Sequence, residues 1–310
     1  MDNEIYQWTY VVEGLLPEAI KLKRKIWLKK GEVLLEKKNE KLFVYVLGGS
    51  HGSIECEEML EKYLHFSALI STNHTSIKPG SGQQLGEGEK MGKKMFVTLR
   101  LKPFLQDDTI EAIEPYAPKF IRFIGNLHDR YVEVVAENEF LAISLDYFYQ
   151  SRSDSIYSDS ALIGSVVSLE ALFNEGPNDI KYKLALRASA LLGMLGSDPI
   201  ELFEQLQNIY KVRSNLVHGV GGSVPDELVS DLPNINRQLI SVCLILMSNE
   251  ERRLIGKKKR KKALMQEIDY ALLNKEKYMN LKREIKKGKR NFNLNIPRKF
   301  ELENGTVIPW

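Results

Sequence analysis

The stretch that decides the fold is residues 198–219, which read DPIELFEQLQNIYKVRSNLVHG. Asp198 suits the N-cap of a helix, Pro199 suits its first position, and Glu201 completes a capping box. Gly219 suits the left-handed residue that commonly follows a helix. The sequence therefore predicts one helix that begins after Asp198 and ends just before this glycine.

Apolar residues recur along the predicted helix in steps of four, three and seven, which indicates one stripe that faces a core. Arg213 falls inside that stripe, so its guanidinium faces a core or an interface and needs an acceptor. His218 lies at the predicted C-terminal end of the helix. The two residues are about 140° apart at 100° per residue, so they act together only at a frayed helix end or across a dimer axis. The stripe consists of Leu202, Leu206, Ile209 and Leu216.

Structural roles also account for this pair of side chains. An arginine in an apolar stripe is often one member of a structural ion pair, and a histidine beside a glycine is often only a helix cap. An arginine and a histidine at this separation are common in helical proteins. Spacing alone is therefore weak evidence for a catalytic site.

The first third of the chain has the composition of strands. Residues 1–105 contain short runs rich in β-branched and aromatic residues, at 10–12, 41–47 and 95–99. Residues 78–93 hold five glycines and no apolar period, so a long flexible loop is expected there. These patterns predict a β-rich N-terminal domain over residues 1–105. Our hypothesis for this domain is a role in sensing or docking.

The remainder of the chain is predicted to be helical. A connecting segment over residues 106–138 leads into a helical domain over 139–255, and a basic helical extension with a tail fills 256–310. The fold class expected is therefore α+β, a β-rich N-terminal domain followed by an all-α helical bundle. Residues 251–310 carry 18 basic and 7 acidic residues, a balance of +11, although the whole chain is only +3. This imbalance favours an anionic partner, with nucleic acid expected first.

Composition limits the class of protein further. Hydrophobic residues make up 43% of the 310-residue chain, which excludes a collagen, a wholly disordered chain and a disulfide scaffold. Cys56 and Cys243 have no CxxC partner and are expected to be free thiols in a reducing compartment, with a bridge between them as the alternative. No signal peptide or membrane span is visible, so a cytoplasmic protein is expected. The five histidines show no metal-ligand spacing, so neither a metal nor another cofactor is expected.

The segment with Arg213 and His218 resembles the signature of the HEPN superfamily, in which an arginine and a histidine are separated by four to six residues on a late helix of a bundle. The wider sequence is similar to the ApeA-like branch of HEPN domains, found in bacterial anti-phage defence proteins. This resemblance covers roughly residues 140–255. The matching blocks are SLEALF at 168–173, KLALRA at 183–188, LLG at 191–193, YKVRS at 210–214 and VHG at 217–219.

The resemblance implies a metal-independent endoribonuclease that acts as a homodimer, with the two Arg–His helices forming one composite site. A ribose 2′-hydroxyl would attack the adjacent phosphate, His218 would transfer a proton and Arg213 would stabilise the charged phosphorane. Only RNA carries that hydroxyl, so RNA is the expected substrate. Ser214 stands where the family commonly has Asn, Asp or His, and Asn215 is expected to supply that polar contact. The biological role implied is a toxic effector in phage defence by abortive infection, with a phage-derived or regulatory trigger acting on the N-terminal domain.

Two further residues are candidates for supporting roles. Glu170 either forms a buried structural pair with Arg187 on the next helix or orients Arg213 as a supporting carboxylate. Tyr210 lies three residues before Arg213 and either packs in the core or stacks beside the guanidinium.

A run of six basic residues near the C-terminus is a candidate nucleic-acid contact. Such a run is usually a solvated surface, but in a protein that cuts RNA it would add phosphate affinity that depends on salt. The run consists of Lys257, Lys258, Lys259, Arg260, Lys261 and Lys262.

Two other functions stay open. One is a non-catalytic HEPN module for RNA binding or dimerisation, in which Arg213 and His218 only hold the dimer together. The other is an interaction protein with no role in nucleic-acid binding.

Overall fold

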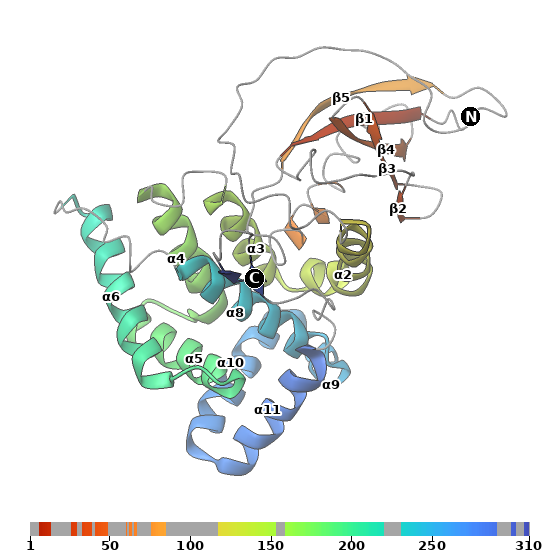
Figure 1. Cartoon of the computed structure of the whole chain (residues 1–310). Coiled ribbons are helices and arrows are strands. Elements are labelled where there is room, and N and C mark those ends of the chain that lie inside the picture. Colours follow the sequence, from red (N-terminus) through yellow and green to blue (C-terminus); the bar gives the residue numbers. More distant parts are fainter. Residues whose placement is uncertain are drawn as a thin grey trace. The chain divides into compact units, whose positions relative to one another are not determined.

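The computed structural model describes residues 6–13, 26–29, 33–38, 41–48, 60, 62–63, 65–66, 76–84, 117–152, 159–219, 231–289, 299–301 and 307–309 (Figure 1). The chain divides into two compact units. One comprises Met1–Ser67, Ser71–His128 and Leu294–Trp310, and the other comprises Ala68–Ile70 and Asp129–Asn293.

The strands of the first unit form an antiparallel sheet with the order β2-β3-β4-β1-β5. Val44, Tyr45 and Val46 lie on β4, which is paired on both sides, and all three are buried. A separate antiparallel pair comes from the predicted C-terminal tail. The strands are β1 (Tyr6–Glu13), β2 (Ile26–Lys29), β3 (Val33–Lys38), β4 (Lys41–Gly48), β5 (Ser76–Gln84), β6 (Lys299–Glu301) and β7 (Val307–Pro309).

Strand β5 occupies part of the region where a flexible loop was expected. Its pairing with β1 shifts register between Thr9 and Val11, which oppose Ser81 and Lys78 respectively. Pro79 lies within that shift, on an edge strand, which is where a sheet tolerates a residue without a backbone N–H. The loop prediction was therefore wrong for residues 78–84, because main-chain pairing with β1 does not require an apolar period. The strand expected at 95–99 lies outside the described residues.

The expected α+β class is wrong, because the structure does not establish a β-rich N-terminal domain. The long described ranges, 117–152, 159–219 and 231–289, are helical almost throughout. The strands before them are separate short ranges, and the segments that join them lie outside the described residues. Runs of β-branched residues indicate only that a segment fits a pleated, half-buried surface. The fold that the structure supports is a helical bundle.

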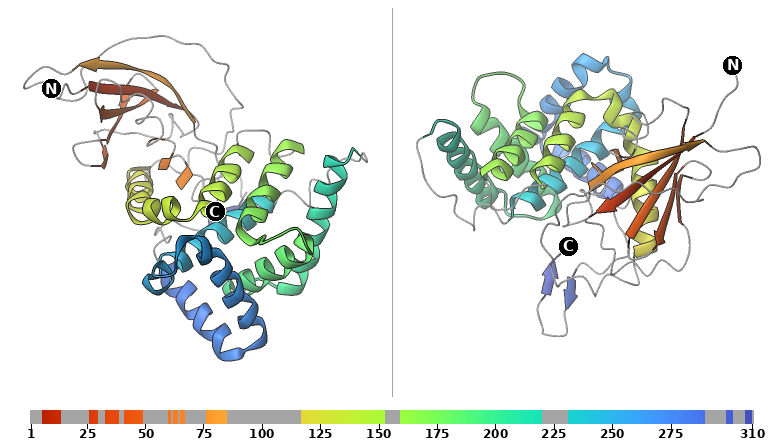
Figure 2. Two further views of the ribbon diagram at one scale, coloured as in Figure 1. Left: turned by 180° about the vertical axis from the view of Figure 1, so that it is seen from behind. Right: turned by 90° about the horizontal axis from the view of Figure 1, so that it is seen from above.

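The helical bundle is built around α8, whose side chains are buried along almost the whole helix (Figure 2). Helices α3, α4, α5 and α11 pack against it, and α10 and α11 lie side by side as a hairpin. The helices are α2 (Ala117–Glu137), α3 (Glu139–Ser151), α4 (Asp159–Phe173), α5 (Ile180–Leu195), α6 (Pro199–Val217), α8 (Leu232–Met247), α9 (Glu250–Arg253), α10 (Lys257–Leu273) and α11 (Lys275–Lys289).

The helix ends that the sequence marks most clearly are confirmed. The Asp198 carboxylate accepts hydrogen bonds from the backbone N–H groups of Ile200 and Glu201, at 2.8 and 3.2 Å, and so caps α6. Gly219 follows that helix with φ of +68°, a left-handed conformation that glycine adopts without steric cost. Helix α8 ends at Met247, and Asn249 caps a separate short helix, α9.

Buried arginines attach the C-terminal helices to the bundle. Arg252 of α9 binds Glu267 of α10 at 2.7 Å and Glu284 of α11 at 2.6 Å. Arg187 of α5 binds Asp269 of α10 at 2.7 Å. Because these arginine side chains are only 9% and 5% exposed, the carboxylates that they hold are fixed components of the fold.

Among the described residues, every helix is either too short or too polar to cross a membrane.

Candidate active site

Helix α6 is attached to the bundle mainly through its middle. Leu206 and Ile209 are buried against α4 and α5, whereas Leu202 and Leu216 of the predicted stripe are only partly buried. Towards the C-terminal end the helix becomes exposed, and Val217 is 51% exposed although it follows the stripe directly. The last turn of α6 is therefore open to solvent on a side where an apolar pattern predicts burial.

Arg213 has an acceptor on the neighbouring helix α4. Its Nη2 lies 3.4 Å from Oε2 of Glu170, and the two side chains are 21% and 18% exposed. Its guanidinium carbon also lies 5.8 Å from the centre of the Tyr210 ring, within the range of a cation–π contact. The structure thus brings Arg213, Glu170 and Tyr210 together. This proximity is what the suggested supporting roles of Glu170 and Tyr210 require.

The other partner considered for Glu170 is occupied elsewhere. Arg187 donates to Asp269 and Glu175, and also to the backbone oxygen of Phe173 at 2.8 Å. The sequence suggested a buried structural pair between Glu170 and Arg187. In the structure Glu170 instead pairs with Arg213. Asp269 comes from a helix 82 residues further along the chain, which residue spacing cannot reveal.

Glu170 also affects the ionisation of Tyr210. Partial burial of the phenol raises the pKa of Tyr210, and the negative charge and hydrogen bond of the nearby Glu170 carboxylate raise it further. Arg213 opposes this shift because its positive charge favours the phenolate. Tyr210 therefore stays a neutral hydrogen-bonding group at physiological pH.

The guanidinium of Arg213 retains unused donor capacity. Its Nε atom is buried and has no hydrogen-bond partner within the part of the chain that the structure describes. A guanidinium has five N–H donors, and the 3.4 Å contact with Glu170 engages only one side of it. The group is held in place, and it has N–H donors that the contact with Glu170 does not engage.

His218 occupies the C-cap position of α6 and is exposed. Its backbone N–H donates to the carbonyl of Ser214 at 3.0 Å, which closes the last turn. Ser214 and Asn215 are partly buried residues of that turn and lie between Arg213 and His218 along the chain. Five residues of helix rise by about 7.5 Å, so both candidate catalytic residues are at one end of α6 but point in different directions.

The six-residue basic run forms the start of α10 and divides into two groups. Arg260 is buried and donates to Glu137 at 2.9 Å and to the backbone oxygen of Arg253 at 2.6 Å. Lys261 donates to the backbone oxygen of Ala171 at 2.7 Å, and burial lowers the pKa of Lys261. These two cations are engaged inside the fold. The exposed members of the run are Lys257, Lys258, Lys259 and Lys262.

Cys243 is a free thiol in the core of α8, and burial raises its pKa to about 12. A thiol in this state is a poor nucleophile at neutral pH. Cys56 lies outside the described residues. No group of three His, Cys, Asp or Glu side chains suited to holding a metal ion occurs among the residues that the structure describes.

Comparisons of the chain with protein-family models, with curated proteins and with solved structures find no match.

Sequence reasoning missed the carboxylates of the C-terminal helices. Glu267, Asp269 and Glu284 bind arginines of α5 and α9, yet nothing in their spacing marks them as partners. The sequence feature that could have pointed to them is composition, because acidic residues are rare in this strongly basic segment.

Proposed function

We propose that this protein is a HEPN-type endoribonuclease that cleaves RNA at a composite site formed by two copies of α6 in a homodimer. The observation that supports the proposal is the end of α6. There Glu170 and Tyr210 position the Arg213 guanidinium, and the His218 side chain is exposed one residue beyond the helix.

The chemistry requires an acid–base group and a fixed positive charge. The 2′-oxygen of a ribose attacks the adjacent phosphorus, the bond to the 5′-oxygen of the next nucleotide breaks, and a 2′,3′-cyclic phosphate and a 5′-hydroxyl result. His218 transfers the proton, and Arg213 stabilises the negative charge on the phosphorane oxygens. Ser214 and Asn215 of the same turn supply polar contacts to the phosphate. No step uses a metal ion.

A dimer is part of the proposal because of the directions of the two side chains. In one copy, Arg213 turns towards Glu170 of the bundle and His218 extends beyond the helix end. Two helix ends related by a twofold axis place the histidine of one copy opposite the arginine of the other. The partly buried Leu216 and the exposed Val217 supply apolar area for that contact. A cytoplasmic location and a role in phage defence belong to the same proposal.

The test is cleavage of a labelled RNA by purified protein in the presence of EDTA. We expect His218→Ala to lower the cleavage rate by about 10²–10⁴-fold while the dimer stays intact. Lys211→Ala, which changes an exposed residue of the same helix, is the matched control and should retain the rate. Equal activity of the two variants, or cleavage that EDTA abolishes, would refute the proposed mechanism.

A non-catalytic HEPN module is the second candidate, and one observation favours it. The charge of Arg213 is already partly compensated by Glu170, as in a structural ion pair. In that case Glu170→Gln and Arg213→Ala should both weaken the dimer, and RNA should bind without being cut. Analytical ultracentrifugation and the cleavage assay on the same samples distinguish the two functions.

A further inference from the structure

The hairpin of α10 and α11 separates its positive and negative side chains. Residues 257–289 contain thirteen basic and four acidic residues, a net charge of +9. Composition alone does not show whether the acidic residues neutralise the lysines around them. Their ion-pair partners decide that question.

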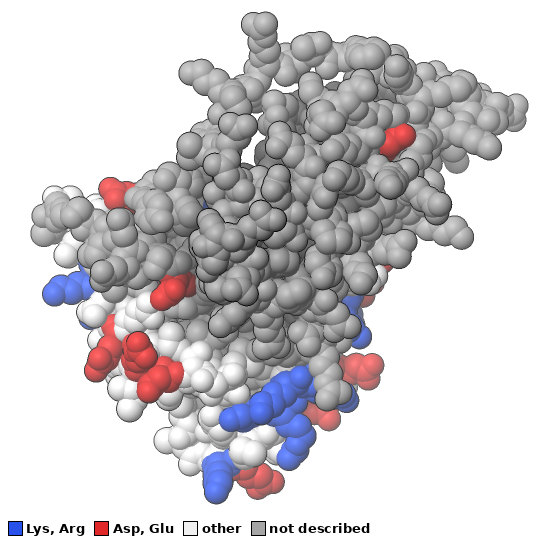
Figure 3. Space-filling view, in the orientation of Figure 1, with Lys and Arg blue, Asp and Glu red and all other residues white. Residues whose placement is uncertain are grey.

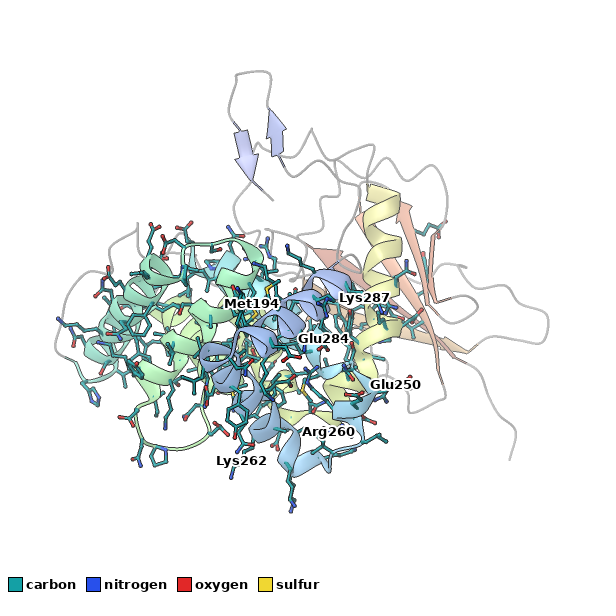
Figure 4. The ribbon with its side chains drawn as sticks, turned by 90° about the horizontal axis from the view of Figure 1, so that it is seen from below. Met194, Glu250, Arg260, Lys262, Glu284 and Lys287 are labelled. Atoms are coloured by element: carbon teal, nitrogen blue, oxygen red, sulfur yellow. The ribbon has the colours of Figure 1, made fainter. Side chains whose placement is uncertain are left out.

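Three of the four acidic residues of the hairpin turn towards the bundle. Glu267 and Glu284 both bind Arg252 of α9, and Asp269 binds Arg187 of α5. Glu284 lies among the helices in Figure 4. Because these carboxylates neutralise arginines that belong to other helices, they do not neutralise the lysines of the hairpin. The fourth acidic residue, Glu276, is exposed.

Three of the seven cations in the sequence of α11 form a track along the helix. Lys275, Lys282 and Lys286 fall within about 40° of one another at 100° per residue, roughly a quarter-turn from the buried Leu281 and Ile285. The track is about 16 Å long at 1.5 Å per residue. Figure 3 shows Lys and Arg side chains gathered over the part of the face where α11 lies.

A track of this length matches a nucleic-acid strand better than the basic run of α10 does. A line of positive charge that follows the backbone is typical of proteins that bind single strands. Lys257, Lys258 and Lys259 are consecutive and therefore point about 100° apart. The next two cations of that run are engaged inside the fold.

Two tyrosines accompany the lysines of the hairpin. Tyr270 is 53% exposed, and Nζ of Lys277 lies 5.4 Å from the centre of its ring. Tyr278 is partly exposed, and Nζ of Lys282 lies 5.6 Å from the centre of its ring. Lys277 lies on the opposite side of α11 from the track at 100° per residue, so Tyr278 is the ring that adjoins the track. An accessible aromatic ring beside cations is typical of surfaces on which unpaired bases stack.

We propose that this lysine track on α11 binds single-stranded RNA, with Lys275, Lys282 and Lys286 contacting phosphates and Tyr278 stacking on a base. The choice of RNA among polyanions rests on the function proposed above. The apolar face of α11 is packed into the bundle, so the helix has no broad apolar face with which to enter a lipid surface.

The test measures binding of a fluorescent 20-nucleotide 2′-O-methyl oligouridylate, which has no free 2′-hydroxyl and so cannot be cut by the proposed reaction. The variant is Lys275→Gln/Lys282→Gln/Lys286→Gln, and each contact with a single strand contributes about 0.7 to the slope of log K against log salt. Three lost contacts should weaken binding about 100-fold at 0.1 M salt and make the slope shallower by about two.

The matched control is Lys257→Gln/Lys258→Gln/Lys262→Gln, which removes the same charge from α10. A much smaller loss in this control supports a specific surface on α11. Equal losses in the two variants would show that only net charge matters. A loss confined to the α10 variant, or none in either, would also overturn the proposal.

Two further measurements separate this inference from its alternatives. Binding to vesicles of phosphatidylserine and phosphatidylcholine that depends on the α11 lysines, without RNA binding, would overturn it in favour of a lipid surface. Cleavage is scored separately with His218→Ala. If RNA binding depends on the α11 lysines but no cleavage occurs, the proposed nuclease activity is refuted and the RNA-binding surface stands. If the α11 variant cleaves RNA and binds it with unchanged affinity, the RNA-binding surface is refuted and the nuclease activity stands.

Discussion

Gly288 of α11 lies so close to α8 that a single added carbon should disturb their packing. A Cβ atom at this position would collide with Cγ2 of Ile245, and it would lie 3.0 Å from Cγ1 and 3.1 Å from Cβ of the same side chain. Ile245 is 5% exposed and has little room to move. We therefore expect Gly288→Ala to destabilise the protein.

The magnitude follows from two opposed effects. Alanine in a helix interior is favoured over glycine by about 1 kcal/mol, and less in a last turn such as this one. An extra carbon in a well-packed core costs about 1–3 kcal/mol. The net expectation is a loss of about 1–2 kcal/mol in the free energy of unfolding, the opposite sign to the usual effect of replacing a helical glycine.

Urea unfolding followed by far-UV circular dichroism measures this loss. Gly176→Ala is the matched control, because a Cβ atom there meets nothing within 4 Å, and its stability should be unchanged or up to about 1 kcal/mol higher. In an Ile245→Ala background, Gly288→Ala should cost much less, because the collision is removed. If Gly288→Ala stabilises the protein as much as Gly176→Ala does, the described packing of α11 on α8 is incorrect.

Two other predictions concern the bundle and the candidate site. Arg252→Ala leaves Glu267 and Glu284 without their shared partner and should lower the free energy of unfolding, measured by calorimetry, by about 3–5 kcal/mol. The control Arg283→Ala changes an exposed residue of α11 and should lower it by less than about 0.5 kcal/mol. Similar losses in the two variants would contradict the structural role of Arg252. Because the pKa of Tyr210 is raised in the folded state, its contribution to stability is complete below its ordinary pKa of about 10 and is lost as the pH rises through the folded-state value. Tyr210→Phe should therefore lose less stability than the parent protein in urea unfolding between pH 9 and pH 11, and parallel curves for the two proteins would argue against the effect of Glu170.

The outcome for α6 shows which parts of the site are readable from sequence. Asp198 and Gly219 act on backbone groups within a few residues of themselves, so their roles as caps were predictable and are confirmed. The need of Arg213 for an acceptor was also predictable from its place in an apolar stripe. The identity of that acceptor was not, because Glu170 had two candidate partners, Arg187 and Arg213, until α4, α5 and α6 were packed.

The basic run of α10 shows the opposite case. By sequence, Arg260 and Lys261 cannot be distinguished from the lysines beside them. In the structure both are engaged, with Glu137 and with the backbone of Ala171. The direction in which a charged side chain points depends on which helix lies beside it, and sequence patterns do not contain that information.

The sequence by itself determined the features whose causes are local: the bounds of α6, its caps, its apolar stripe and the positive charge of the last fifth of the chain. Only the tertiary structure decided the matters that depend on residues far apart in the chain. These include the pairing of β5 with β1, the partner of Arg213, the inward turn of the carboxylates of α10 and α11, and the close approach of Gly288 to Ile245. The physical reason is range. Capping and helical periodicity act over a few residues, whereas an ion pair or a packing contact forms between whichever side chains the assembled helices bring together.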